Sequence, residues 1–171
     1  RMELKRDRAT SLRIDMMLAL LLPISAGELK LTSSDPAIQP MLNYNYLAEP
    51  FDRQRLRHGV RLCLSLAQSD DLRHLIGERL EPTDADLASD DALDDWLLRE
   101  ATTFSHIAGT CKMGPDSDPM AVVDQYGKVY GLDGLRIADA SIMPDLVRAP
   151  INPTVIMMGE RLADLIQQEH S

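Results

Sequence analysis

The chain has 171 residues, of which 44% are apolar and 26% are charged, so it has the size and composition of one globular domain rather than of a disordered tail. Its 18 basic and 27 acidic residues give a formal net charge of −9, which disfavours nucleic acid or an anionic membrane surface as a partner. Cys63 and Cys111 are too few for a disulfide framework, and we expect free thiols in a reduced, cytoplasmic setting.

The polar and basic residues 1–10 predict a disordered or truncated end. No secretory signal follows them, and the longest apolar run, residues 16–24, is far shorter than the roughly 20 residues of a membrane helix. Because the chain begins with Arg1 rather than Met, we expect a fragment or a processed piece.

Residues 11–103 predict an α+β domain, an antiparallel sheet with helices packed on one side. Met16–Leu22 is continuously apolar, which is typical of a strand buried on both faces. Glu28–Thr32 alternates polar and apolar residues and predicts a half-buried neighbouring strand. Residues 33–40 contain Asp35-Pro36 and predict a loop.

Two helices are predicted in the same domain, Phe51–Gln68 and Ser89–Ala101. Ser89 is an expected N-cap, and the acidic residues after it lie where the helix dipole favours anions, so they need no ligand. The expected inner faces are Leu56, Val60, Leu62, Cys63, Leu64 and Leu66 on the first helix, and Leu93, Trp96 and Leu97 on the second.

From Thr102 onward glycine and proline separate short apolar segments, which predicts loops and short strands. The last helix is predicted over Thr154–Gln168. Its expected apolar stripe consists of Val155, Met158, Leu162, Leu165 and Ile166.

His106 stands out among the histidines because small neighbours in residues 105–114 let backbone approach a ligand closely. An imidazole can accept a proton near neutral pH, so His106 is either a catalytic base or a satisfied loop histidine. His58, His74 and His170 have no partners at metal-ligand spacing, and no metal site is expected. The chain also lacks the Gly-x-Gly-x-x-Gly turn of a dinucleotide-binding domain.

Residues 106–113 read HIAGTCKM, followed by AVVD at 121–124, VYGLDGLRIADASIMP at 129–144 and NPT at 152–154. In order and spacing these segments resemble the C-terminal signature of the glucose–methanol–choline (GMC) flavin oxidoreductases. Looser similarity upstream extends the resemblance over roughly residues 12–166.

The resemblance implies an FAD-dependent oxidoreductase acting on a small-molecule alcohol. In such enzymes a histidine, matched by His106, removes the hydroxyl proton while hydride passes to flavin N5. It further implies that residues 104–171 carry the active site and FAD contacts. The ADP part of FAD would be held by the N-terminal part of the same enzyme, so this chain is either a C-terminal piece of a longer enzyme or one chain of a split one, and alone it should be inactive. A split arrangement would leave an apolar interface exposed on this chain.

The family usually places a second His or Asn before the last helix, and Pro150 stands at that position here. Some pyridoxine-oxidase-like members also carry proline there. Asn152 is a second candidate for contacting the substrate oxygen, and its alternative role is N-cap of the last helix with Pro153 at N1.

The resemblance also implies flavin contacts. It places the flavin at the start of the last helix, Pro153 and Thr154 beside Asn152, where a helix N-terminus favours an anion. Ser105 and Asp139-Ala140 match segments that contact the flavin, and Asp139 has the alternative role of bracing the turn before Ser141.

Two other functions remain open. A hydroxynitrile lyase of the same family would use His106 on a cyanohydrin without redox chemistry at the flavin. A catalytically inactive fragment would only bind a partner.

Overall fold

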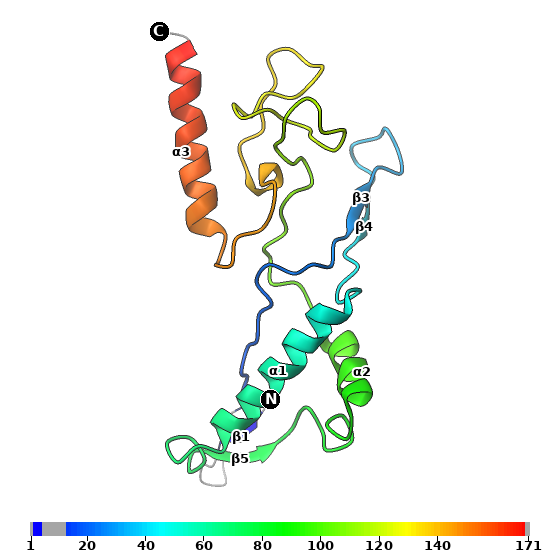
Figure 1. Cartoon of the computed structure of the whole chain (residues 1–171), viewed down its shortest axis with the longest axis vertical. Helices are drawn as coiled ribbons and strands as arrows, with labels where there is room; N and C mark the ends of the chain where they lie inside the picture. Colours follow the sequence, from blue (N-terminus) through cyan, green and yellow to red (C-terminus); the bar gives the residue numbers. More distant parts are fainter. Residues whose placement is uncertain (1, 5–12, 170–171) are drawn as a thin grey trace. The chain divides into compact units, whose positions relative to one another are not determined.

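The computed structural model describes residues 2–4 and 13–169. Short strands and longer helices give the expected α+β composition (Figure 1). The elements are β1 (Met2–Leu4), β2 (Arg13–Ile14), β3 (Glu28–Lys30), β4 (Met41–Asn43), α1 (Pro50–Ala67), β5 (Ile76–Arg79), α2 (Asp90–Glu100), the 3-10 helix η1 (Ala140–Ile142) and α3 (Asn152–Glu169).

The chain divides into two compact units. The first unit consists of Arg1–Leu20, Ile24–Gly27 and Tyr44–Thr102; the second consists of Leu21–Pro23, Glu28–Asn43 and Thr103–Ser171. The main division falls one residue before the predicted boundary between residues 103 and 104. The segment Glu28–Asn43, which we expected in the first domain, clusters with the second unit instead.

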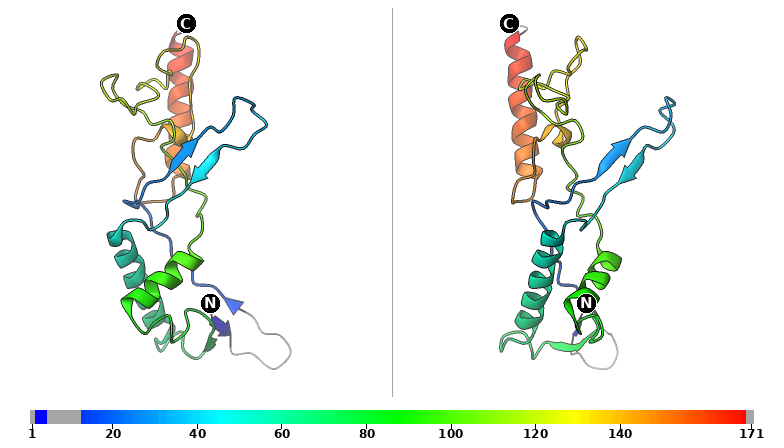
Figure 2. Two further views of the ribbon diagram at one scale, coloured as in Figure 1. Left: turned by 90° about the vertical axis from the view of Figure 1, so that its right-hand side faces the viewer. Right: turned by 45° about the vertical axis from the view of Figure 1, so that its right-hand side comes forward.

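The first unit combines a three-stranded antiparallel sheet with two packed helices. The strand order is β2-β1-β5, and Met2 lies opposite both Ile14 and Arg79. Helices α1 and α2 lie against each other in both views of Figure 2. Their shared core consists of the buried residues Leu47, Val60, Leu93 and Leu97, against which Leu20, Leu56, Leu64, Leu87 and Trp96 pack.

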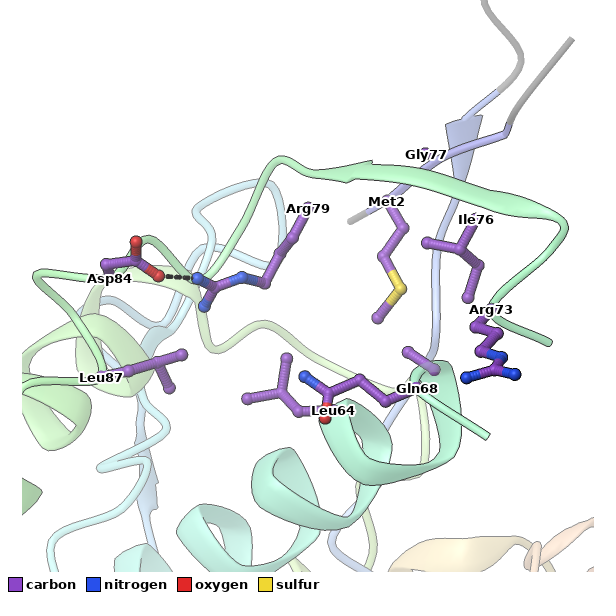
Figure 3. Close-up of a pocket in the computed structure, with 10 residues that line it drawn as sticks. Met2, Leu64, Gln68, Arg73, Ile76, Gly77, Arg79, Asp84 and Leu87 are labelled. Carbon is purple, nitrogen blue, oxygen red and sulfur yellow. Dashed lines mark hydrogen bonds and ion pairs between the residues drawn. The ribbon is translucent and has the colours of Figure 1, made fainter. Parts of the chain in front are cut away.

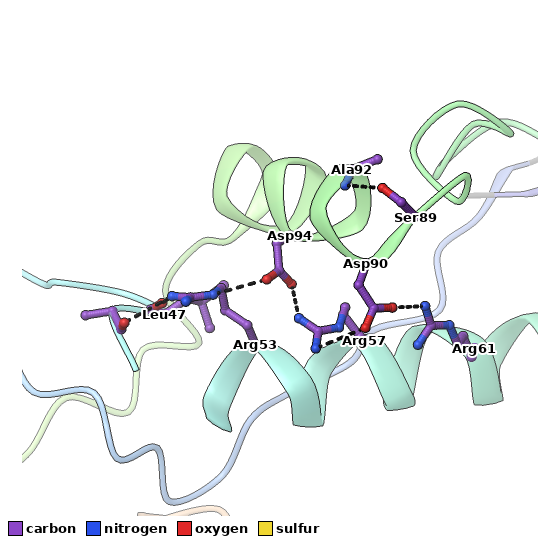
Figure 4. A network of polar contacts seen from close by, with 9 residues as sticks. Leu47, Arg53, Arg57, Arg61, Ser89, Asp90, Ala92 and Asp94 are labelled. Carbon is purple, nitrogen blue, oxygen red and sulfur yellow. Dashed lines mark hydrogen bonds and ion pairs between the residues drawn. The ribbon is translucent and has the colours of Figure 1, made fainter. Parts of the chain in front are cut away.

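Ion pairs join the two helices along one side of this core (Figure 4). Arg57 contacts Asp94 at 2.6 Å and Asp90 at 3.3 Å, and Arg53 contacts Asp94 at 3.2 Å. The Ser89 hydroxyl accepts a hydrogen bond from the Ala92 N–H at 3.1 Å, which confirms the predicted N-cap. The acidic start of α2 is therefore explained by arginine partners and a capped helix, without a ligand.

The start of α1 is fixed by a buried carboxylate. The Asp52 side chain is fully buried and accepts hydrogen bonds from the Ile24 N–H at 3.0 and 3.1 Å and from the Ser25 N–H at 2.7 Å. The Ser25 hydroxyl in turn accepts the Glu49 N–H at 3.0 Å. The bend at residues 24–25 is thus held against the first turn of α1.

The second unit packs α3 against a core made largely by loops. Its buried centre consists of Val123, Ile142 and Leu162. The same unit contains a hairpin in which β3 and β4 pair antiparallel, with Glu28 opposite Asn43 and Lys30 opposite Met41. The loops contain little regular secondary structure. Two features determine their conformation: backbone hydrogen bonds between loops, and glycines with positive φ at the turns.

Gly127 is the tightest glycine of this core. Its φ is +71°, and a Cβ there would lie 2.8 Å from the Ile137 carbonyl oxygen. We expect Gly127→Ala to lower the free energy of unfolding by about 2 kcal/mol or more, because strain and overlap combine. Gly131→Ala is the matched control, since φ is +76° there and no atom lies within 4 Å of the added Cβ. Equal urea midpoints for the two variants would contradict the predicted overlap.

The predicted sheet was wrong in its pairing. Met16–Leu22 forms no regular strand, and Met17 is 79% exposed. Glu28–Lys30 pairs with Met41–Asn43 rather than with that segment, since the predicted loop after it turns the chain back on itself. An apolar run indicates that a segment is buried but does not indicate which segment it contacts. Leu20 of this run packs against the core shared by α1 and α2.

Four short strands were not predicted: β1, β2, β4 and β5, of two to four residues each. They are too short to show a periodic pattern. β1 falls within residues 1–10, where a disordered or truncated end was expected; residues 1 and 5–10 of that range lie outside the described part of the chain.

The helices agree closely with the prediction, but the buried face of α1 is narrower than expected. Leu62 and Leu66 on α1 are 53% and 46% exposed, so they do not belong to the buried stripe expected there. Leu93 and Leu97 on α2 are buried as expected. Within residues 2–4 and 13–169, no helix is both long and apolar enough to cross a membrane.

Candidate active site around His106

The segment that follows His106 is hydrogen-bonded to η1. The N–H groups of Gly109, Cys111 and Met113 donate to successive carbonyl oxygens of residues 140–142 at 3.2, 2.9 and 2.8 Å. Gly109 has φ +83°, and a Cβ there would lie 3.4 Å from the Met143 carbonyl oxygen. Glycine therefore allows the loop to turn beside η1, and the structure brings the His106 segment together with Asp139-Ala140.

His106 itself is half-buried. Its ring meets the ring of Phe104 edge-on, with centroids 4.7 Å apart and planes at 69°. Between them Ser105 has φ +60°, and its N–H donates to the Thr103 hydroxyl at 2.9 Å. This aromatic contact was not predicted from the sequence.

Asp139 is the N-cap of η1. Its carboxylate accepts the Ser141 N–H at 2.8 Å, which is the turn-bracing role that the sequence left as one of two alternatives. Ala140 follows within η1 and accepts the Gly109 N–H through its carbonyl oxygen. The carboxylate of Asp139 thus shapes the backbone against which the His106 loop is anchored.

The last helix begins two residues earlier than predicted. The Val155 N–H donates to the Ile151 carbonyl oxygen at 2.9 Å, so Asn152 and Pro153 already lie in the first turn of α3. The alternative in which Asn152 is the N-cap was therefore wrong, because Ile151 occupies the N-cap position. Asn152 and Pro153 are exposed and Thr154 is half-buried, whereas Ile151 before them is buried.

The start of α3 and the segment that contains His106 lie at the same end of the second unit in Figures 1 and 2. Among the described residues, no hydrogen bond links the His106 side chain to Pro150 or Asn152. Pro150 is exposed and has no side-chain donor. The structure therefore joins His106 to Asp139-Ala140 by direct contacts of their segments, and not to the second-residue position.

A separate cavity of about 580 Å³ lies in the first unit, between the end of α1 and β5 (Figure 3). Met2 and Leu64 face it, and Arg79 at its edge is ion-paired with Asp84. It contains none of the predicted site residues. Within the described ranges no three His, Cys, Asp or Glu side chains gather as a metal site.

Comparison with known sequences assigns most of the chain to one family. A family model described as GMC oxidoreductase matches residues 23–159. The oxygen-dependent choline dehydrogenase of Paraburkholderia xenovorans is 41% identical over 143 residues, which cover 84% of this chain and 25% of that protein. That of Burkholderia pseudomallei is 42% identical over 144 residues. The chain thus spans about a quarter of the length of the curated relatives it matches.

Solved structures show the same similarity. The pyridoxine 4-oxidase from Mesorbium loti superposes with a TM-score of 0.74 at 30% identity, covering 88% of this chain and 28% of that one. A formate oxidase from Aspergillus oryzae RIB40 gives a TM-score of 0.78 at 34% identity, covering 86% of this chain and 26% of the other. A fungal aryl-alcohol oxidase gives 0.74 at 34% identity, with 88% and 24% covered.

Proposed function

The chain is the C-terminal domain of a GMC family oxidoreductase, and from that premise we propose that it belongs to an FAD-dependent enzyme that oxidises a small alcohol. His106 is the base in this proposal. The observation that carries it is a half-buried imidazole on a loop that three backbone hydrogen bonds anchor to η1. The relatives named above act, by their names, on choline, pyridoxine, formate and aryl alcohols, so the substrate class is a small oxygenated molecule.

The residues of the second unit fit FAD. The first two residues of the 18-residue helix α3, Asn152 and Pro153, are exposed, and a helix N-terminus stabilises a negative charge. Phe104 and Ile107 beside His106 are 43% and 52% exposed, which suits contact with a flat aromatic group. When bound, FAD supplies the acceptor for the hydrogen and two electrons that leave the alcohol carbon.

His106 contributes proton transfer. A neutral imidazole within hydrogen-bond reach of the substrate hydroxyl accepts its proton, and the growing negative charge on oxygen makes the neighbouring C–H bond a better hydride donor. Because the loop after His106 is tied to η1, the imidazole is carried on a fixed backbone, which lowers the entropic cost of alignment.

The second position differs from the usual His or Asn of the family. Pro150 offers only its carbonyl oxygen, so we assign the polar contact with the substrate oxygen to the exposed Asn152 carboxamide at the start of α3. Asp139 has an indirect role, because it holds the backbone of η1 to which the loop after His106 is hydrogen-bonded. Ser105 and Thr154 contribute hydroxyl groups at the edges of the proposed flavin site.

The second unit also presents a surface for the FAD-binding N-terminal part of the enzyme. It carries exposed apolar side chains on a loop and on α3, and burying them against another protein region would remove apolar area from water. They include Leu132, Leu135, Ile156 and Met157, which are 49% to 60% exposed.

The proposal is tested by mixing the full-length, FAD-loaded enzyme anaerobically with a panel of small alcohols. We expect the visible flavin absorbance to bleach with a productive alcohol, and one aldehyde or ketone to form per flavin. Cleavage of a cyanohydrin without bleaching would instead identify the hydroxynitrile lyase. If a protein with bound FAD carries out neither reaction, the result would support the alternative of a partner-binding domain.

A further inference from the structure

The His106 imidazole has one conformational constraint beyond its backbone. Among the residues that the structure describes, no hydrogen bond or ion pair reaches the ring, and the edge-on contact with Phe104 is its one aromatic contact. The terminal torsion of a histidine is broad and roughly two-fold, so a free ring would sample several directions. A catalytic base accepts the proton of a substrate hydroxyl only when its ring is held in one particular orientation.

The residue between the two rings, Ser105, has an unusual backbone conformation that accompanies this contact. Ser105 has φ +60°, in the left-handed region that non-glycine residues seldom adopt. The Thr103 hydroxyl accepts the Ser105 N–H at 2.9 Å and so helps to hold the turn. Backbone conformations of this kind persist only where their surroundings enforce them, and they gather at functional sites.

Exposure argues against a purely structural role for Phe104. Its side chain is 43% exposed, and it is absent from the buried centre of the second unit, which is formed by Val123, Ile142 and Leu162. The centroid of the Phe104 ring lies 4.7 Å from that of the imidazole. Edge-to-face aromatic pairs have a preferred geometry, so the pair restricts both rings.

We infer that Phe104 is a positioning residue, which holds the His106 imidazole in the orientation that accepts the substrate proton. This inference rests on the proposed function, because it assigns Phe104 a task only if His106 is the base. Thr103 and Ser105 provide the turn that makes the contact possible.

The test compares Phe104→Leu with Phe104→Tyr in the full-length, FAD-loaded enzyme. Leucine keeps apolar bulk but removes the ring, and tyrosine keeps the ring as the matched control. We expect Phe104→Leu to lower kcat about tenfold to hundredfold with KM changed less than about twofold, since misorientation affects the chemical step. Phe104→Tyr should lose less of kcat than Phe104→Leu, because it keeps the ring that contacts the imidazole. Should the leucine variant not fold, Phe104→Met provides a second ring-free side chain.

A readout independent of turnover uses the ring protons of His106, identified by their loss in His106→Ala. The aromatic neighbour displaces their NMR frequencies, and we expect this displacement to vanish in Phe104→Leu and to remain in Phe104→Tyr. Parent-like kcat and unchanged frequencies in Phe104→Leu would overturn the inference. An equal loss of kcat in Phe104→Tyr, or a loss confined to KM, would also overturn it.

The two proposals fail in different ways. If His106→Ala keeps full turnover, the proposed base is wrong. If His106→Ala is inactive while Phe104→Leu is parent-like, only the positioning role is wrong.

Discussion

Replacing His106 by alanine in the full-length, FAD-loaded enzyme is expected to lower kcat for the alcohol by about 10²- to 10⁴-fold, the usual contribution of general acid–base catalysis. The half-buried ring lies outside the buried core of the second unit, so FAD content and thermal stability should change little. The measurement is the rate of flavin reduction after anaerobic mixing with substrate. Added imidazole should restore part of that rate.

The matched control is His58→Ala, because His58 is exposed on α1 in the first unit. It should reduce flavin at the parent rate. An unchanged rate in His106→Ala would remove His106 from the chemistry and with it the proposed mechanism.

Asp52→Asn is expected to give the largest loss of stability among conservative substitutions in the first unit. The Oδ2 atom of the fully buried carboxylate accepts hydrogen bonds from both the Ile24 and Ser25 N–H groups, and the single oxygen of an amide carries no charge and is a weaker acceptor. Hydrogen bonds to a charged group contribute about 1.5–3 kcal/mol, so losing the charge should lower the free energy of unfolding by about 1–3 kcal/mol. The measurement is urea unfolding at neutral pH, with the exposed Asp71→Asn as control.

The Asp52 substitution also predicts a pH dependence. Burial by itself would raise the pKa of Asp52, but hydrogen bonds from Ser25 and Ile24, together with Arg55, hold that pKa below its ordinary value. The carboxylate's contribution to stability is therefore complete above the unfolded pKa of about 3.9 and is lost as the pH falls through the lower folded value. The stability difference between parent and Asp52→Asn should shrink below about pH 4; a difference that stays constant there would contradict this account.

Local signals were sufficient to predict the helices. At α2 the Ser89 cap, the acidic first turn and the apolar residues Leu93 and Leu97 agree with one another, and all lie within a dozen positions. The sheet could not be predicted in the same way. The apolar run Met16–Leu22 indicated burial, but the choice of strand partner depends on distant segments, and β3 pairs with β4 instead.

At the candidate site, even a contact between near neighbours in the sequence could not be predicted. His106 was predicted as the base from its motif and its small neighbours, and that role stays a prediction. The contact with Phe104 could not be predicted, because it depends on the left-handed φ of a serine, a conformation for which glycine and asparagine are the usual signals. Asp52 was missed because its partners lie 27 and 28 residues away along the chain.

The central claim is that the His106 imidazole stands beside a flavin that other parts of the enzyme largely bind. A crystal structure of the full-length protein with FAD and an alcohol or substrate analogue tests it most directly. We predict an imidazole nitrogen at roughly 2.6–3.2 Å from the substrate oxygen, on the reactive side of the flavin ring. A His106 side chain turned away from the flavin, or enclosed by aliphatic residues, would contradict the account.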